Sequence, residues 1–591
     1  MAPLDLRVTI PGVARTPASL SFSFDDVPLQ AHPGETIAVA LVAAGKQACR
    51  LTRSNAARGP FCGMGACHDC LVSADGDTVR ACLTPVADGM RVTTHAPRLG
   101  QTPNRIEPDS AAPLTVDVAV VGAGPAGLSA ALSAARSGLR VALIDERKQA
   151  GGQYYKQPSP GLTITEAELD RQFREGRALA ARTMAAGVVS LSEAAVWSST
   201  GDNDLLIVQP SGTRRISYRK LILATGAVER AVPFPGWTLP GVMTTGAAQS
   251  FLRSCAVSPG RRILIAGHGP LNLQLAAELL KAGITVVAVA ELSPAPGLQN
   301  LLDLATMLAM APRLVADGLT YRLALQRHGV PLLHGHSVVK AEGKGSLTGV
   351  TLAPLDADRK PDMNRSRRFE ADVLCLGYGF NPALELAAAL GCELSFDARW
   401  RHLAVVCDRE GRTSKPDILA AGDGARFGGA RMAMASGVIA GYAAARDCGA
   451  PSATEGTLEL DKARTALRRA GRFQDALWSI YRARPITTEL AEPDTLVCRC
   501  EEVSQGALRA ALDDGAASLG SIKRQTRLGM GRCQGRYCAP LAAEILSCAL
   551  GRPPDAEQMF APRTPLRPVS VGAIAALDLG GQVAETEAGQ P

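Results

Sequence analysis

The spacing of apolar and polar residues changes along the chain. Residues 1–95 predict short alternating strands, such as "LRVTI" and "LSFSF", with one helix in "GETIAVALVAAG" at 34–45. The polar, Pro-rich stretch 96–113 predicts a linker. Beyond residue 450 the chain becomes polar and then helical, and it closes in a Pro-rich tail. The pattern therefore predicts several domains and not one repeated unit.

Two longer stretches combine both periodicities in the order strand, Gly-rich turn, alanine-rich helix and strand. They are residues 115–146, "TVDVAVVGAGPAGLSAALSAARSGLRVALIDE", and residues 261–291, "RRILIAGHGPLNLQLAAELLKAGITVVAVAE". Each has the length of a βαβ unit of a dinucleotide-binding domain. The sequence therefore predicts a multidomain α/β fold with two dinucleotide-type domains.

The first Gly-rich turn has the full GxGxxG pattern directly after a strand. Gly122 permits the tight turn, Gly124 lets a pyrophosphate approach the backbone, and Gly127 lets helix and strand pack closely. Asp145 ends the next strand and is placed to bind a ribose hydroxyl pair. We therefore predict a dinucleotide site here.

The second Gly-rich turn departs from this pattern. Gly267 and Gly269 are present, but Asn272 stands where the third glycine is expected, and Glu291 falls one position late for a ribose ligand. Two interpretations stay open: an NAD(P) site at Gly267, Gly269 and Glu291, or a domain retained for packing. No CxxC dithiol lies in this region, so disulfide-reductase chemistry is not expected.

Four cysteines near the N-terminus have ligand-like spacing. Cys62-x4-Cys67-x2-Cys70 is followed by Cys82, and the intervening "LVSADGDTV" predicts a β-hairpin that carries the fourth sulfur back. Four thiolates around one loop can hold a 2Fe–2S cluster, with Gly63 and Gly65 opening backbone donors to sulfur. Zinc is the alternative, but its usual paired knuckles fit this spacing poorly.

A second group lies near the C-terminus, at Cys498, Cys500, Cys533 and Cys538. The segment between them includes "SQGALRAALDDGA", which predicts a helix. We predict a second 2Fe–2S cluster here, again with zinc as the alternative.

Composition and charge exclude several classes of function. The 591 residues are 46% hydrophobic and 20% charged, with a net charge of +7, which is mild for this length. No stacking platform for nucleic acid, no apolar run long enough for a membrane span and no signal peptide are found, so a cytoplasmic location is expected. Fifteen cysteines without an export signal favour metal or redox work over disulfides.

Segments 115–450 together resemble the flavoproteins of the glutathione and thioredoxin reductase type. The resemblance rests on the first Gly-rich unit, on Ala224-Thr225-Gly226 after a strand, and on Gly422-Asp423 after a later strand. It implies FAD at the first site, with "GGQYY" at 151–155 near the flavin. The residues implied to bind FAD are Gly122, Gly124, Pro125, Ala126, Gly127, Asp145, Glu146, Gly152, Gln153, Val196, Ala224, Thr225, Gly226, Gly422 and Asp423.

The two ends of the chain resemble iron–sulfur modules. "FCGMGACHDCLV" with "RACLTPVADGM" is similar to plant-type, β-grasp ferredoxin domains, and "TRLGMGRCQGRYC" is similar to the small helical module of bacterioferritin-associated ferredoxin. With the tail "TPLRPVSVGAIAAL" at 564–577, the whole order resembles α-type subunits of heteromeric amine dehydrogenases. That group includes hydrogen cyanide synthase, opine oxidase, D-hydroxyproline dehydrogenase and sarcosine oxidase α.

The expected fold is therefore a two-dinucleotide-binding-domain flavoprotein, flanked by a β-grasp ferredoxin-like domain and a small helical 2Fe–2S domain. The predicted boundaries are 1–97 for the ferredoxin-like domain, 98–114 for the linker, 115–235 and 371–450 for the two parts of the FAD domain, 236–370 for the second dinucleotide domain, 451–490 for a connecting helical segment, 491–552 for the helical iron–sulfur domain, and 553–591 for the tail.

The resemblance also implies a function. A D-amino-acid-oxidase-like β subunit with its own FAD would oxidise a small amine or amino acid, and this chain would pass the electrons through FAD and two 2Fe–2S clusters to an acceptor. It further implies that an FMN can sit at a subunit junction. The alternatives are a stand-alone NAD(P)H-dependent reductase and a non-enzymatic iron–sulfur delivery or regulatory module. No acid–base pair stands out as catalytic, and the sequence does not identify the substrate, the acceptor or the stoichiometry.

Overall fold

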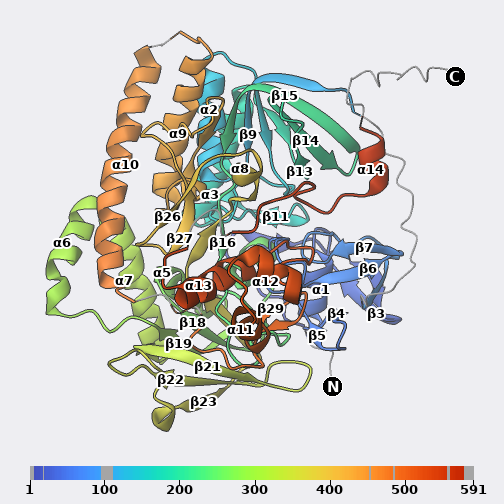
Figure 1. Ribbon diagram of the computed structural model, residues 1–591, viewed down its shortest axis with the longest axis vertical. Helices are drawn as coiled ribbons and strands as arrows, with labels where there is room; N and C mark the ends of the chain where they lie inside the picture. Colours follow the sequence, from blue (N-terminus) through green and yellow to red (C-terminus); the bar gives the residue numbers. More distant parts are fainter. Residues whose placement is uncertain are drawn as a thin grey trace.

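The computed structural model describes residues 5–17, 19–94, 111–451, 454–483, 486, 488–554 and 559–577. Most of the predicted linker, from residue 98 to 110, lies outside these residues, and so do parts of the predicted tail, at 555–558 and 578–591. The prediction of a multidomain α/β fold is confirmed (Figure 1). Among the described helices, none combines the length and the apolar character needed to cross a bilayer.

The N-terminal part is a five-stranded sheet with one helix against it. The strand order is β3-β2-β8-β6-β7, with β2 at Leu20–Phe24, β3 at Val27–Ala31, β6 at Leu71–Ala74, β7 at Asp77–Arg80 and β8 at Arg91–Thr94. The predicted helix is α1, Ile37–Ala43, and the Thr36 hydroxyl caps it by accepting from the Val39 N–H.

The strand predicted at "LRVTI" is wrong. Around it the structure has only isolated bridges, from Arg7 to Val257 and from Ile10 to Val13. The Leu6 N–H donates to the Ala43 carbonyl and the Val8 N–H to the Ala256 carbonyl. The alternating residues therefore bridge the end of α1 and a helix of the central part, and no neighbouring strand continues the ladder.

The first dinucleotide unit contains a seven-stranded sheet. It has the order β12-β10-β9-β15-β14-β13, with β28 also paired to β15, and β9, β10, β12, β15 and β28 run parallel. Their bounds are β9 Leu114–Val121, β10 Val141–Ile144, β12 Val189–Leu191, β13 Ala195–Ser198, β14 Asp204–Gln209, β15 Gly212–Leu223 and β28 Ile418–Ala420. The predicted helix of this βαβ unit is α2, Pro125–Arg136.

The second unit is a parallel five-stranded sheet in the order β17-β24-β18-β19-β20. Its strands are β17 Val242–Thr244, β18 Arg262–Gly267, β19 Thr285–Glu291, β20 Leu332–His334 and β24 Val373–Gly377, and α5, Pro270–Lys281, crosses between β18 and β19. The sequence predicts that the chain returns to the first unit after residue 370. The apolar strand β24, however, pairs in the second sheet, so this sheet extends past that boundary. A three-stranded sheet of β21 His336–Glu342, β22 Gly349–Pro354 and β23 Arg367–Glu370 is attached.

Long helices cover one side of the molecule. α9, Gly429–Asp447, packs on α2, and α10, Thr454–Ile480, packs on α9 and on α6, Leu301–Met310 (Figure 1). The other helices of the central part are α3 Arg171–Ala185, α4 Thr245–Cys255, α7 Pro312–Arg327 and α8 Glu385–Ala389.

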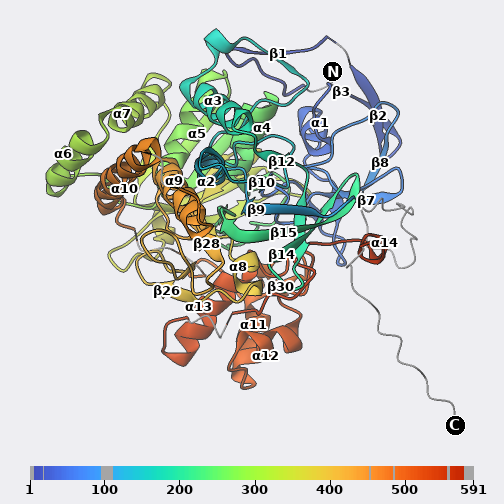
Figure 2. The ribbon, with the colours of Figure 1, turned by 90° about the horizontal axis from the view of Figure 1, so that it is seen from above.

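The C-terminal part is a small helical module. A short hairpin, β29 Leu496–Cys498 with β30 Val503–Ser504, leads into α11 Gln505–Asp513, α12 Leu519–Thr526 and α13 Cys538–Leu550, and α14, Val571–Ala575, lies farther along. The helix predicted at "SQGALRAALDDGA" is α11. In Figure 1 this module lies between the second unit and the N-terminal part, and in Figure 2 it lies at one edge of the molecule, near α8. It shares one hydrophobic core with Phe61 and Trp237.

Close packing of α2 on α9 yields a stability prediction. A Cβ atom on Gly437 would lie 2.1 Å from the Ala126 carbonyl oxygen, whereas a Cβ on Gly471, in the middle of α10, would meet no atom within 4 Å. Gly437→Ala should therefore destabilise the protein by about 1–3 kcal/mol through overpacking. Gly471→Ala should stabilise it by about 0.5–1 kcal/mol through helix propensity. Thermal unfolding of both variants measures this, and equal melting temperatures would contradict the packing argument.

Candidate functional site

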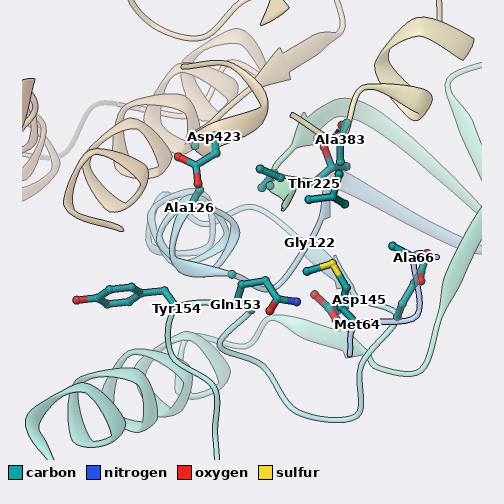
Figure 3. A pocket seen from close by; sticks show the side chains of 18 of the residues that line it. Met64, Ala66, Gly122, Ala126, Asp145, Gln153, Tyr154, Thr225, Ala383 and Asp423 are labelled. Atoms are coloured by element: carbon teal, nitrogen blue, oxygen red, sulfur yellow. Dashed lines mark hydrogen bonds between the residues drawn. The ribbon is translucent and has the colours of Figure 1, made fainter. Parts of the chain in front are cut away.

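One cavity brings together the residues predicted to bind FAD. It has a volume of about 390 Å³ and lies at the carboxyl ends of the first sheet, where α/β folds bind their ligands. Every predicted FAD residue except Gly127 lines it (Figure 3).

The glycines of the first turn have distinct positions. Gly122 has φ +105°, and a Cβ there would lie 2.2 Å from the Ala224 carbonyl oxygen. Gly124 faces the cavity and Gly152, and it precedes Pro125, the first residue of α2. Gly127 lies behind the wall, where a Cβ would lie 1.7 Å from the Gly122 carbonyl oxygen. The turn can thus present the N-terminus of α2 to an anion.

Two half-buried carboxylates lie on different sides of this turn (Figure 3). Asp145 follows β10 and accepts from the N–H groups of Ala123 at 2.6 Å and Arg147 at 2.8 Å. Asp423 follows β28 and accepts from the Gly428 N–H at 3.4 Å. Burial raises the pKa of both above the usual range. An anion site between two hydroxyl acceptors fits a dinucleotide such as FAD.

Part of the cavity wall comes from both ends of the chain and was not predicted. Met64, Gly65 and Ala66 belong to the loop between Cys62 and Cys67, and Arg536, Leu566 and Arg567 come from the C-terminal part. Arg567 forms an ion pair with Glu146, one of the predicted FAD residues. The tail "TPLRPV" contains no binding motif of its own, so the sequence does not predict that Leu566 and Arg567 line the cavity.

The cavity also holds a buried titratable pair that sequence reasoning missed. The Lys156 ammonium group donates to the Gln249 side-chain oxygen at 2.8 Å, and Glu229 accepts from the Gly246 N–H at the start of α4. Burial lowers the pKa of Lys156 to about 7 and raises the pKa of Glu229 to about 7. These are the side chains at the cavity best suited to hold or release a proton near neutral pH.

The second Gly-rich turn is filled by the protein's own side chains. The Glu291 carboxylate accepts from the Gly269 N–H at 3.0 Å and lies 3.0 Å from the His268 ring nitrogen. Asn272, where a glycine was expected, is buried; its amide donates to the Gly377 carbonyl at 3.1 Å and accepts from the Thr245 hydroxyl at 3.0 Å. The helix–strand contact is thus made by a polar side chain with its hydrogen bonds satisfied.

A helix covers the mouth of this second turn. A Cβ atom on Gly269 would lie 3.1 Å from the Trp478 ring of α10, and the rings of His268 and Trp478 have centroids 5.4 Å apart. Tyr481, also near the end of α10, has its ring centroid 5.9 Å from that of His268. A dinucleotide at Gly267 and Gly269 would require the Trp478 ring to move away.

The four N-terminal cysteines are brought together by the predicted hairpin. β6 and β7 turn at Asp75 and Gly76, both with positive φ, and return Cys82 to Cys70, where the two thiols are hydrogen-bonded. Cys62 and Cys67 form the other thiol pair.

Backbone donors surround this group. The N–H of Cys67 donates to the Cys62 sulfur, that of Asp69 to the Cys67 sulfur and that of Cys82 to the Cys70 sulfur, each at 3.4 Å. Burial disfavours the Cys62 thiolate, but the Cys67 thiol and backbone N–H groups outweigh it and lower the pKa of Cys62. Two thiol pairs with amide donors fit the two iron atoms of a 2Fe–2S cluster.

The C-terminal cysteines also converge. The sulfur of Cys500 lies 3.7 Å from that of Cys498 and 3.9 Å from that of Cys533, and the Cys538 thiol contacts Cys498. A Cβ on Gly531 would lie 2.4 Å from the Cys500 sulfur, so this position requires glycine. Hydrogen bonds from the Cys500 and Cys538 thiols lower the pKa of Cys498. These donors also fit a cluster.

Within the described residues, no three His, Cys, Asp or Glu side chains are grouped so as to hold a single metal ion. Each set of four thiols is joined instead by pairwise contacts.

Three segments match known families. Residues 116–446 match the pyridine nucleotide-disulphide oxidoreductase family, residues 18–97 a 2Fe–2S iron–sulfur cluster binding domain, and residues 492–578 the sarcosine oxidase A3 domain.

Curated relatives match over most of the chain. Hydrogen cyanide synthase subunit HcnB of Pseudomonas aeruginosa is 34% identical over 458 residues, which are 77% of this chain and 97% of the relative. An opine oxidase subunit of Agrobacterium tumefaciens is 33% identical over 470 residues, 78% of this chain and 92% of the relative. Among solved structures, L-proline dehydrogenase from P. horikoshii has a TM-score of 0.69 at 21% identity, covering 97% of this chain and 100% of that one, which shows a shared fold.

The two cysteine groups should hold separate clusters. Cys70→Ser and Cys538→Ser should each remove about half of the iron and acid-labile sulfide, because each breaks one set of four ligands. Cys548→Ser is the matched control, since Cys548 is exposed and lies on the same helix, α13, as Cys538. Unchanged iron in Cys538→Ser would contradict a cluster at the C-terminal group.

Proposed function

Because this chain belongs to the pyridine nucleotide-disulphide oxidoreductase family of FAD flavoproteins, in the group of hydrogen cyanide synthase subunit HcnB and the opine oxidase relative, we propose that it is the electron-transfer subunit of a heteromeric amine or amino-acid dehydrogenase. The proposed substrate is of the opine, D-hydroxyproline or glycine type, oxidised in a D-amino-acid-oxidase-like β subunit that carries its own FAD. The electrons then pass through this chain to an acceptor.

One observation carries the proposal. The loop residues Met64, Gly65 and Ala66 form part of the wall of the cavity lined by Gly122 and Asp145. When bound, FAD accepts electrons as a pair and a 2Fe–2S cluster carries them singly. A shared wall between the two sites is the arrangement that such a conversion needs, and it also supports FAD at Gly122, Gly124, Asp145 and Asp423.

The cavity residues would serve this chemistry directly. The N-terminus of α2 binds and orients the anionic part of the cofactor, and the buried Lys156 and Glu229 hold or release a proton inside the cavity. Met64 and Ala66 form the apolar wall of the cavity on the side of the cysteine loop.

The surface supports an assembly. Leucines on and next to α6, and on α7, are strongly exposed, among them Leu298 at 83% and Leu302 at 84%. Exposed apolar side chains grouped on neighbouring helices are typical of protein–protein contacts. The FMN implied for a subunit junction stays a prediction.

Neither alternative function has comparable support. An NAD(P)H-dependent reductase needs a dinucleotide where Trp478 now lies. A cluster-delivery module needs accessible ligands, whereas Cys62, Cys67, Cys498 and Cys538 are buried.

One prediction of this function concerns the partner. When the chain is co-expressed with a D-amino-acid-oxidase-like β protein and mixed without oxygen with opines, D-hydroxyproline or glycine, one of these should bleach the flavin and cluster absorbance. The chain alone should not respond, because its cavity is proposed to pass electrons on and not to bind the amine. Bleaching of the chain alone would show that it oxidises the amine itself, and no response of the pair would contradict the electron-transfer role.

Another prediction concerns nicotinamide nucleotides. Anaerobic NADH or NADPH should leave the flavin of the isolated chain oxidised, since Trp478 covers the second Gly-rich turn. Dithionite serves as the positive control for a reducible flavin. Rapid bleaching by either nucleotide would favour the reductase function instead.

A further inference from the structure

The two cysteine groups meet through the residues that flank their ligands. Phe61 directly precedes Cys62, and Tyr537 directly precedes Cys538. The rings of Phe61 and Tyr537 have centroids 5.5 Å apart at an interplanar angle of 72°, a favourable edge-to-face contact. Both rings are buried. Segments more than four hundred residues apart are therefore in direct side-chain contact.

A buried ion pair makes a second link. Arg499 lies between Cys498 and Cys500, and its guanidinium pairs with the carboxylate of Asp69, the residue before Cys70. The same guanidinium lies 4.1 Å from the centroid of the Phe61 ring. Asp69 is only 1% exposed and is held from its other side by Arg50 at 2.8 Å. A charge network that is so deeply buried fixes the two cysteine loops relative to each other.

The Tyr537 hydroxyl is the unexplained group at this contact. The residue is 6% exposed, and its hydroxyl makes no hydrogen bond of ordinary geometry in the part of the chain that the structure describes. The Cys62 thiol is within reach of a weak hydrogen bond with this hydroxyl, outside ordinary hydrogen-bond geometry. A buried hydroxyl without a partner is costly, and a thiolate ligand is an acceptor.

We propose that Tyr537 is a positioning residue whose hydroxyl donates a hydrogen bond across the interface to the Cys62 thiolate. Together with the ring contact to Phe61 and the Arg499–Asp69 ion pair, this hydrogen bond couples the two cysteine groups into one relay for electrons. This rests on the proposed function, in which each group holds a 2Fe–2S cluster. In the relay step one electron leaves one centre, which is oxidised, and enters the other, which is reduced, with no bond made or broken and no proton moved. The electrons come from the amine substrate.

The hydrogen bond has a measurable consequence. A donor to a ligand sulfur stabilises the extra negative charge of the reduced state, so its loss makes reduction harder. Tyr537→Phe removes only the hydroxyl and keeps the ring that contacts Phe61. We expect the reduction potential of the N-terminal centre to shift to a more negative value, while that of the C-terminal centre moves less.

The control is another buried tyrosine in the same core. Tyr378 is 5% exposed, and its hydroxyl lies 3.4 Å from that of Ser337. Tyr378→Phe should leave both potentials unchanged. Both variants are measured as full-length protein by EPR-monitored redox titration, and Cys82→Ser and Cys538→Ser assign each signal to its centre. An equal shift in Tyr378→Phe, or none in Tyr537→Phe, would overturn the hydrogen bond.

Coupling is tested separately. In dithionite-reduced full-length protein the two EPR signals should show a spin–spin interaction that is lost in Cys538→Ser, and Phe61→Leu should weaken it. About four iron atoms per chain without any interaction would overturn the relay while leaving the proposed function intact. About two iron atoms per chain would overturn both the relay and the second cluster of the proposed function. The potential of the remaining centre in Tyr537→Phe would still decide the hydrogen bond.

Discussion

The arrangement of the modules depends on the burial of one carboxylate, that of Asp69. A charged group at 1% exposure is tolerated only where opposite charges and donors surround it. Arg50 of the N-terminal part satisfies one oxygen, and the other is satisfied by Arg499 of the C-terminal part. Arg499 in turn donates to the Trp237 carbonyl, and its guanidinium lies over both the Phe61 and Trp237 rings. Three parts of the chain therefore complete one charge network, and none of them completes it alone.

The two dinucleotide-type units illustrate how one topology serves two purposes. In the first, glycines keep the turn open, and the cavity in front of it receives residues from both ends of the chain. In the second, Asn272 fills the position of the third glycine and donates to the Gly377 carbonyl, and Trp478 lies against Gly269. That unit supports the cysteine loop instead, since the Thr244 N–H donates to the Phe61 carbonyl and a Cβ on Gly63 would lie 2.9 Å from Ala247 of α4. The second dinucleotide-type unit thus supports the loop that contains Cys62.

The elements predicted correctly are those determined by hydrophobic periodicity and by turn residues close in the sequence. Both βαβ units, the helix around residue 40, the hairpin that returns Cys82 and the helix after Ser504 could be predicted from periodicity and turn residues. The strand at "LRVTI" could not, because its backbone partners are Ala43 and Ala256, which no local pattern reveals. The cavity wall at Met64–Ala66, the Trp478 cover, the Lys156–Glu229 pair and the meeting of the two cysteine groups all depend on contacts between distant segments. A single sequence contains no signal for such contacts beyond the presence of a glycine or an aromatic residue.

Fusion of both cysteine groups into one chain explains why their interface can be so buried. A partner that binds and leaves must expose its contact residues to water each time, and an interface built on Asp69, Arg499 and Arg50 would then leave charges unpaired on both surfaces. Within one polypeptide the two groups are held at high effective concentration, so the contact need not be reversible. The chain can therefore place a fully desolvated ion pair and two packed aromatic rings between its cysteine groups, where an exchangeable contact would favour exposed charges. The geometry suits a fixed link between the two cysteine groups inside one polypeptide.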